Sequence, residues 1–300
     1  MLQRPEFAAV QRPVKLQALR YSAMAAACLV ITGLVLSILS RRDDPSVNGR
    51  RLSASAYDLL DPSSPTYAAS SNVIAHLGTQ AIPFLKRVVT SGETGLEKMA
   101  HKLNVPVPLP GHRMMLGRQL AVCRAARILG TNAAPLNTEL LPLTQSRIGS
   151  IRHAALEALS VTSTPAQLLP LATNAIATDP FIDCRLAATR IAFALGMNPT
   201  EVVHLAFGNI GKGTRCTGAA ARAFAEELRT LAPEKVLEDT LRRFSRSDDS
   251  EVRRFIASCA PECLPSNVVA VEILTRLSGD TNGAVARAAT NGLMEIQRLK

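Results

Sequence analysis

The 300-residue sequence contains no tryptophan, and aromatic residues make up only 4% of it. β-sandwiches and β-barrels favour β-branched and aromatic side chains, so this shortage argues against both. The chain instead contains 44 alanines and 39 leucines, which favour helices and, in the case of alanine, close packing between them. Hydrophobic residues make up 47% and charged residues 19%, a balance that excludes general disorder. The composition therefore predicts an all-α fold.

Positive charge is unevenly distributed along the chain. The formal net charge is +10, of which residues 1–20 supply +3 and residues 41–51 supply +2. Residues 52–300 therefore carry only +5. Because strong nucleic-acid binding requires a concentrated basic surface, this distribution argues against a nucleic-acid partner for the body of the protein.

An uncharged apolar run of twenty residues, 21–40, lies between Arg20 and Arg41. A helix of this length spans about 30 Å, the thickness of the hydrocarbon core of a bilayer. The run therefore predicts one transmembrane helix at residues 21–40, preceded by a basic N-terminal tail at residues 1–20. A cleaved signal peptide is the alternative, but residues 38–40 (Ile-Leu-Ser) lack the small-x-small cleavage pattern.

The flanking charges do not decide the orientation of this helix, because four Lys or Arg residues stand on each side of it. A short basic tail before a first apolar segment favours a cytoplasmic N-terminus. We therefore expect a single-pass protein of the inner (cytoplasmic) membrane, with its body on the extracytoplasmic side. The Asp, Ser and Pro residues of 41–65 predict a linker to the body, with one short helical stretch at about residues 52–60.

The rest of the chain, residues 66–300, repeats a helical pattern. Residues 78–83 and 130–135 share four of six amino acids, so one structural unit occurs twice. Apolar residues then recur at offsets 0, 3, 4, 7 and 8, which is one face of a helix, in four stripes. These stripes begin at Ile151, Cys184, Val252 and Val285. Their separations of 33, 68 and 33 residues predict one more unit near Gly218, and another precedes them near Gly117.

A turn and a second helix follow each stripe, and proline usually marks them because it suits the first turn of a helix. The predicted second helices comprise residues 136–141, 167–176, 201–207, 234–244 and 268–277. Pro261 predicts that the helix containing Val252 ends or kinks there. The pattern predicts an α-solenoid of about six helix pairs plus a terminal helix, with a period of about 34 residues.

Paired helices of this period, with alanine and leucine stripes and an arginine after the first apolar position, resemble HEAT repeats. Residues 151–159, Ile-Arg-His-Ala-Ala-Leu-Glu-Ala-Leu, carry the resemblance most closely. The Trp/Gly/Tyr pattern of TPR repeats and the Thr-Pro-Leu-His of ankyrin repeats are both missing. A single anchor followed by a short array also resembles membrane-anchored HEAT-repeat proteins of bacteria. The resemblance implies a non-catalytic scaffold.

The repeat arginines allow two interpretations. They are Arg118, Arg152, Arg185 and Arg253, and two other units carry Ala219 and Ala286 instead. As functional groups they could bind phosphate or acidic partners. As structural groups they would pair with carbonyls and carboxylates at the turns between units, for which the nearby candidates are Asp179, Asp183, Asp248 and Asp249. Regular spacing along a scaffold favours the structural role.

Motifs for catalysis or metal binding do not emerge from the sequence. The five histidines show no HExxH or other short ligand spacing, and no Ser/His/Asp or Cys/His set can be assembled. Residues 208–214 look superficially like a phosphate loop but lack its first glycine and its Ser/Thr. Cys184, Cys259 and Cys263 occupy stripe positions, where cysteine serves as a small core residue. We therefore expect no catalytic residues, no cofactor, no metal and no small-molecule substrate.

An insertion at about residues 92–113 interrupts the array and contains the alternating prolines of residues 105–110. A polyproline-like loop could dock a partner, although long loops more often cover one end of such an array.

The function we expect is a membrane-tethered α-solenoid scaffold that holds another protein on a concave face lined by the second helices. One alternative is HEAT-like nucleic-acid binding, supported by Arg242, Arg243, Arg246, Arg253 and Arg254. Acidic residues between 234 and 251 nearly neutralise that group. A HEAT-like lyase or glycosylase is a weaker alternative with no motif in its favour.

Overall fold

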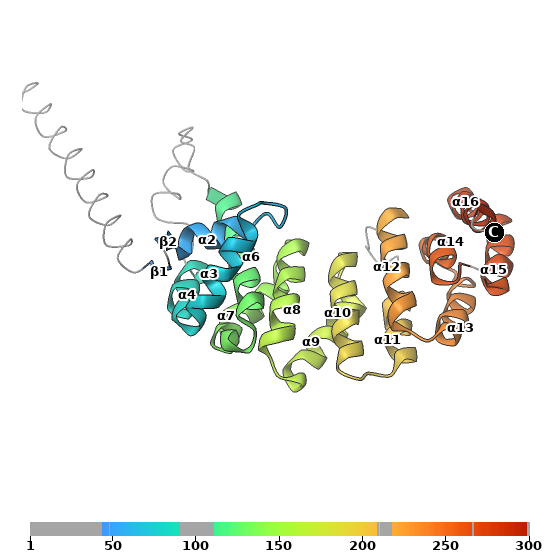
Figure 1. The fold of residues 1–300 in the computed structure, drawn as a ribbon. Helices are drawn as coiled ribbons and strands as arrows, with labels where there is room; N and C mark the ends of the chain where they lie inside the picture. The colour runs from blue at the N-terminus through green and yellow to red at the C-terminus, as the bar shows by residue number, and fades with distance from the viewer. Residues whose placement is uncertain are drawn as a thin grey trace, which may run out of the picture.

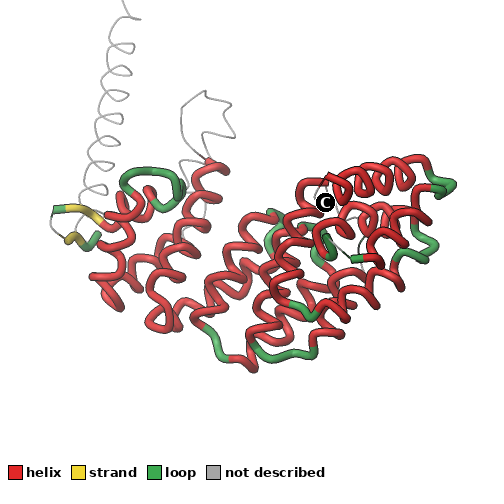
Figure 2. Tube along the Cα trace, turned by 45° about the vertical axis from the view of Figure 1, so that its right-hand side comes forward, coloured by secondary structure: helices red, strands yellow, loops and turns green. Residues whose placement is uncertain are grey.

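The computed structural model describes residues 44–90, 111–208, 210 and 218–298, except Asn48 and Ser266. This part of the chain is all-α apart from a short antiparallel ribbon of β1 (Ser46–Val47) and β2 (Arg50–Arg51), in which Ser46 pairs with Arg51. Figure 2 shows the ribbon at one end of a row of helices. The predicted all-α class is confirmed.

One layer of the row consists of the helices that carry the apolar stripes. They are α6 (Gly111–Leu129), α8 (Gly149–Thr162), α10 (Ile182–Ala194), α12 (Gly218–Leu231), α14 (Ser250–Cys263) and α16 (Gly283–Arg298). Each of these helices contacts the next one along the row (Figure 1). The unit predicted near Gly218 is confirmed as α12.

The second layer is formed by the helix that precedes α6 and by the helices that alternate with those of the first layer. They are α4 (Ile82–Thr90), α7 (Asn137–Leu140), α9 (Pro165–Thr178), α11 (Pro199–Gly208), α13 (Glu234–Phe244) and α15 (Val268–Ser278). From α9 onward each helix contacts the next. All five predicted ranges agree within two residues, and at 136–141 the 3₁₀ turns at Gly130–Leu136 and Leu141–Gln145 leave α7 only one turn long. Pro135 and Pro142 account for this, because neither can donate a helical hydrogen bond.

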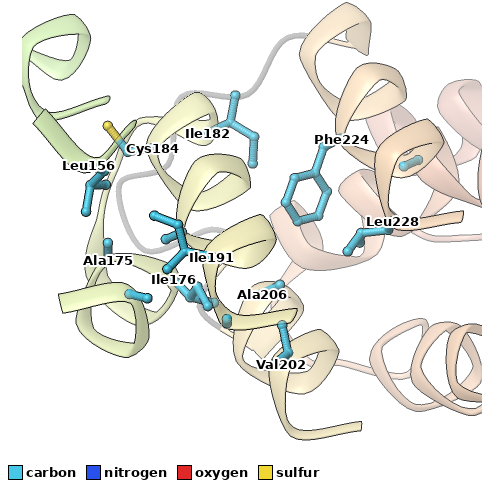
Figure 3. Close-up of a cluster of buried hydrophobic side chains, with 14 of the residues drawn as sticks. Leu156, Ala175, Ile176, Ile182, Cys184, Ile191, Val202, Ala206, Phe224 and Leu228 are labelled. Atoms are coloured by element: carbon cyan, nitrogen blue, oxygen red, sulfur yellow. The ribbon is translucent and has the colours of Figure 1, made fainter. Parts of the chain in front are cut away.

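The core is shared between neighbouring helices. The predicted stripe residues of α8, α10 and α14 are all buried, and in α12 the buried face consists of Ala221, Phe224, Ala225 and Leu228. Figure 3 shows side chains of successive helices meeting in one cluster, including Leu156 of α8, Ile191 of α10 and Leu228 of α12. Because no helix buries its stripe alone, burial couples each pair to the next.

The predicted linker at 41–65 is wrong for its described residues, which pack into the body. Helix α2 (Leu52–Asp58) contacts α3 (Tyr67–Leu77) and α6, and Leu52 and Leu59 are fully buried. The Asp44 carboxylate accepts hydrogen bonds from the backbone N and Oγ of Ser53 at 3.0 and 2.6 Å. The acidic and hydroxyl side chains that suggested a linker therefore fix turns and helix ends.

Several sequence-based expectations fall outside the described residues. They are the basic tail at 1–20, the membrane helix at 21–40, nearly all of the insertion at 92–113, and most of the glycine-rich turn at 208–214. Within the described ranges, none of the helices has the length and hydrophobicity needed to cross a bilayer.

Helix α14 does not end at Pro261 but continues to Cys263. Gly292 of α16 packs at this point. A Cβ atom at Gly292 would lie 3.0 Å from Pro261 Cγ and 3.2 Å from both the Ala257 carbonyl oxygen and Leu274 Cδ2. Pro261 has no N–H to donate to the Ala257 carbonyl, and the glycine lets α16 approach the helix at that site.

Replacing Gly292 with valine should therefore destabilise the protein by about 1–3 kcal/mol, because the added atoms overpack the contact with α14 and α15. Gly283→Val is the control, since a Cβ atom there meets only the guanidinium end of Arg287, at 3.4 Å. Urea unfolding followed by far-UV circular dichroism measures both variants. Equal losses of stability would contradict the close approach at Gly292.

Candidate functional site

Arg152 of α8 is held at the turn between α9 and α10. Its Nε and Nη2 donate to the two carboxylate oxygens of Asp179, both at 2.7 Å, and its Nη1 donates to the Ser146 carbonyl at 2.7 Å. The side chains of Arg152 and Asp179 are only 12% and 7% exposed. All three guanidinium nitrogens are engaged by protein atoms, so this arginine clamps two turns together.

Arg253 of α14 repeats this geometry. Its Nε and Nη2 donate to Asp280 at 2.7 and 3.0 Å, and its Nη1 donates to the Ser247 carbonyl at 2.8 Å. In both clamps the aspartate lies 27 residues after the arginine and the carbonyl six residues before it. The hydrogen bonds from Arg253 lower the pKa of Asp280, and the same contact raises the pKa of Arg253.

Asp280 is a partner that the sequence reasoning missed, although the 27-residue spacing of Arg152 and Asp179 could have located it. Of the other candidates, Asp248 contributes only its carbonyl to Arg253 Nη1, at 3.0 Å. Asp249 instead caps α14 by accepting a hydrogen bond from the Glu251 N–H at 2.8 Å, and Asp183 is exposed.

The other two repeat arginines lie in different surroundings. Arg185 of α10 is 1% exposed, and its Nε donates to the Asp179 carbonyl at 2.6 Å. Asp179 therefore joins two units, since its carboxylate contacts Arg152 and its carbonyl contacts Arg185. Arg118 is half-buried in α6. The residues 27 positions after Arg118 and Arg185 are Gln145 and Lys212, so neither arginine has an aspartate at the equivalent position.

Phenylalanines fill the junction where the aspartate and the next arginine are both replaced. The Phe207 ring of α11 lies 5.9 Å from Phe224 of α12 and 5.8 Å from Phe255 of α14, measured between ring centroids. Phe244 of α13 stacks on Phe207 at 6.3 Å. Edge-to-face and stacked rings at these distances add to the burial energy. The junction also has a polar contact, because Arg190 of α10 donates to the Glu227 carboxylate of α12 at 2.6 and 2.8 Å.

The described cysteines are free and buried. Burial raises the pKa of Cys123, Cys184 and Cys263 to about 12, so these thiols stay protonated at neutral pH. The Cys184 Sγ donates to the Gly149 carbonyl of the preceding unit, at 3.2 Å. The placement agrees with the expected role of cysteine as a small core residue. The described residues contain no group of three or more His, Cys, Asp or Glu that could bind a metal ion.

The arginines that supported nucleic-acid binding are largely occupied. Arg242 pairs with Glu272 at 3.0 Å, and Arg254 pairs with Glu251. Arg243 lies 5.6 Å from the Phe244 ring centroid, beside a hollow of about 650 Å³ between α11 and α13. Its Nη1 lies 3.5 Å from His204 Nδ1, and burial together with Arg243 lowers the pKa of His204. Arg242, Arg253 and Arg254 are therefore compensated by carboxylates, whereas the exposed Arg243 and Arg246 form no ion pair with a described residue.

The helices of the second layer differ in the number of charged residues they carry. Helix α13 carries six charged residues, of which Glu234, Lys235, Asp239, Arg242 and Arg243 are exposed. Helix α9 carries none, and its exposed residues include Gln167, Leu169, Pro170 and Asn174. Leu169 is 41% exposed. The exposed side of α9, in the middle of the second layer, is therefore uncharged.

No protein-family model, curated protein or solved structure matches this chain.

The clamp at Arg253 predicts a specific pH dependence. Asp280→Asn should destabilise the protein by about 1.5–3 kcal/mol at neutral pH, the value of hydrogen bonds to charged groups. Because the folded-state pKa of Asp280 is lowered, the clamp's contribution is present above the ordinary carboxyl pKa of about 4. It is lost as the pH falls through the folded-state pKa. The stability difference between parent and variant should therefore shrink below about pH 4.

Urea unfolding at several pH values measures this difference. Asp239→Asn is the control, because Asp239 forms an exposed ion pair with Lys235 at 2.9 Å and its loss should change stability much less than the loss of Asp280. A stability difference for Asp280→Asn that stays constant down to low pH would argue against the clamp.

Proposed function

We propose that this chain is a membrane-tethered α-solenoid of HEAT-like helix pairs that holds another protein. Two layers of helices that contact their successors along a row support the solenoid assignment. The recurrence of one arginine clamp, with the same spacings of 27 and six residues in two units, also supports it. The charge-free run at residues 21–40 would be the anchor of a single-pass inner-membrane protein, with the body on the extracytoplasmic side.

The uncharged exposed side of α9 is the observation that carries the protein-binding role. Contiguous uncharged surface with an exposed leucine is typical of protein interaction sites, whereas isolated exposed apolar residues are common everywhere. In a repeat array the second helices form a continuous surface, so a partner could extend from α9 to α11. We expect the partner to contribute apolar side chains to Leu169 and its neighbours.

The repeat arginines fit this proposal in a structural role. Arg152 and Arg253 are engaged by carboxylates and carbonyls, which leaves them little capacity to bind phosphate. No specific observation favours nucleic-acid binding or lyase or glycosylase chemistry over protein binding.

A charge on α9 should separate partner binding from folding. In full-length protein purified from membranes, Leu169→Glu should reduce the amount of co-purifying protein at least about tenfold, because a carboxylate in an apolar contact costs more than about 1.4 kcal/mol. Val161→Glu is the matched control, since Val161 is 38% exposed on α8 in the other layer. Quantitative mass spectrometry of protein purified in mild detergent measures the outcome, and a separate alkaline carbonate wash of the membranes tests the anchor.

Two results would contradict the proposal. If both variants retain the same proteins as the parent, α9 is not the binding surface. If the parent chain itself leaves the membrane in the carbonate wash, residues 21–40 are not an integral anchor.

A further inference from the structure

The two ends of the helix row expose different surfaces. At the C-terminal end, the exposed residues of α16 are polar or charged apart from Met294, and include Arg287, Thr290, Asn291, Gln297 and Arg298. At the N-terminal end, α3 contains no Asp, Glu, Lys or Arg, and it exposes Ala68, Ala69, Asn72, Ala75 and His76. A repeat array in water needs polar outer faces on its terminal units. Among the described residues, the exposed positions of α3 are less polar than those of α16.

Basic residues slightly outnumber acidic ones at the N-terminal end. Residues 44–90 contain Arg50, Arg51, Lys86 and Arg87 against Asp44, Asp58 and Asp61. Lys86 pairs with Glu139 of α7 at 3.4 Å, whereas Arg51 of β2 is exposed and forms no ion pair with a described residue. The preceding residue, Arg50, differs from Arg51 because it forms an ion pair with Asp58. Four basic and three acidic residues leave this end with a net charge of +1, and the exposed Arg51 is the group available to an anionic lipid surface.

The chain enters the fold at this same end, and the connection is short. The described fold begins at Asp44, which caps α2 through Ser53. Only residues 41–43 lie between it and the predicted membrane segment. Three residues reach at most about 11 Å when fully extended. The headgroup layer on each side of the hydrocarbon core is about 5–8 Å thick. A connection this short keeps β1, β2 and the neighbouring α3 close to the headgroups.

We propose that the N-terminal end face lies against the headgroup layer of a phospholipid bilayer. This face consists of Arg51 together with Ala68, Ala69, Asn72, Ala75 and His76. The proposal rests on the membrane tether proposed above. The bilayer covers the exposed alanines of α3, Arg51 lies near lipid phosphates, and α16 lies at the distal end of the row. The scaffold is then held upright on the membrane instead of swinging on a long linker.

Single tryptophans can test this arrangement, because the native chain has none. We would place one on the end face, as Ala69→Trp or independently as Ala75→Trp, and one at the far end as Asn291→Trp. All three parent residues are exposed. Each full-length variant would be reconstituted into phosphatidylcholine and phosphatidylglycerol vesicles that carry a nitroxide quencher on the lipid headgroup. Far-UV circular dichroism checks that each variant keeps its helices.

Ala69→Trp and Ala75→Trp should lose most of their fluorescence, while Asn291→Trp should keep it. Unquenched end-face tryptophans in chains that float with the vesicles, or equal quenching at all three positions, would overturn the end-face proposal and leave the tether intact. A chain that does not float with the vesicles would overturn the tether and the end-face proposal together. Flotation and quenching therefore distinguish the two failures.

Discussion

A single pair of short helices cannot bury both sides of its apolar stripe, and this constraint governs the whole structure. In α10, Cys184, Ala188 and Ala192 are fully buried because α8, α9, α11 and α12 surround the helix. Small side chains let these helices approach closely, as Gly292 does at Pro261. Each unit is thus stable only when its neighbours are in place. The lack of tryptophan and the abundance of alanine follow from the same requirement.

Hydrogen bonds between polar groups at the turns fix the angle between units. Asp179 does this in two directions, since it accepts Arg152 on its carboxylate and Arg185 on its carbonyl. Where the aspartate and the following arginine are replaced, by Lys212 and Ala219, the ring cluster around Phe207 and the exposed Arg190–Glu227 ion pair connect the neighbouring helices. Neighbouring units are therefore held by two kinds of contact, one polar and directional, the other apolar. The pKa is lowered for Asp280 by Arg253 and for Glu227 by Arg190, so acid should weaken these two contacts.

Periodicity was the part of the sequence that could be interpreted with most detail. The stripe that begins at Ile151 is buried as expected, and α13 has the predicted bounds, Glu234–Phe244. Residues 44–65 were misjudged because aspartate, serine and proline occur both in linkers and at helix ends. Only the buried Leu52 and Leu59, which meet distant helices, distinguish the two cases. Tertiary contacts, which a local sequence pattern does not contain, determine that this segment packs into the body.

The candidate sites were predictable to different degrees. The spacing from Arg152 to Asp179 also leads from Arg253 to Asp280, so the second clamp could have been found from the sequence. The uncharged surface of α9 could not, because its leucines look alike in sequence, yet Leu168 is buried and Leu169 is exposed. The identity of the buried leucine depends on how α9 rotates against α10, which packing determines. The N-terminal end face could not be predicted either, because the expected linker at residues 41–65 placed the body away from the membrane.

The claim on which all of this depends is that neighbouring helix pairs share one continuous core. Thermal unfolding of Ala188→Glu and Ala223→Glu, followed by far-UV circular dichroism, tests it most directly. Both changes place the same side chain in the middle of a first-layer helix, but Ala188 is fully buried in α10 and Ala223 is exposed on α12. Ala188→Glu should cost about 3 kcal/mol or more and lose the single cooperative transition, because it buries a charge without a partner, whereas Ala223→Glu should melt like the parent. Equal melting curves for the two variants would contradict the shared core.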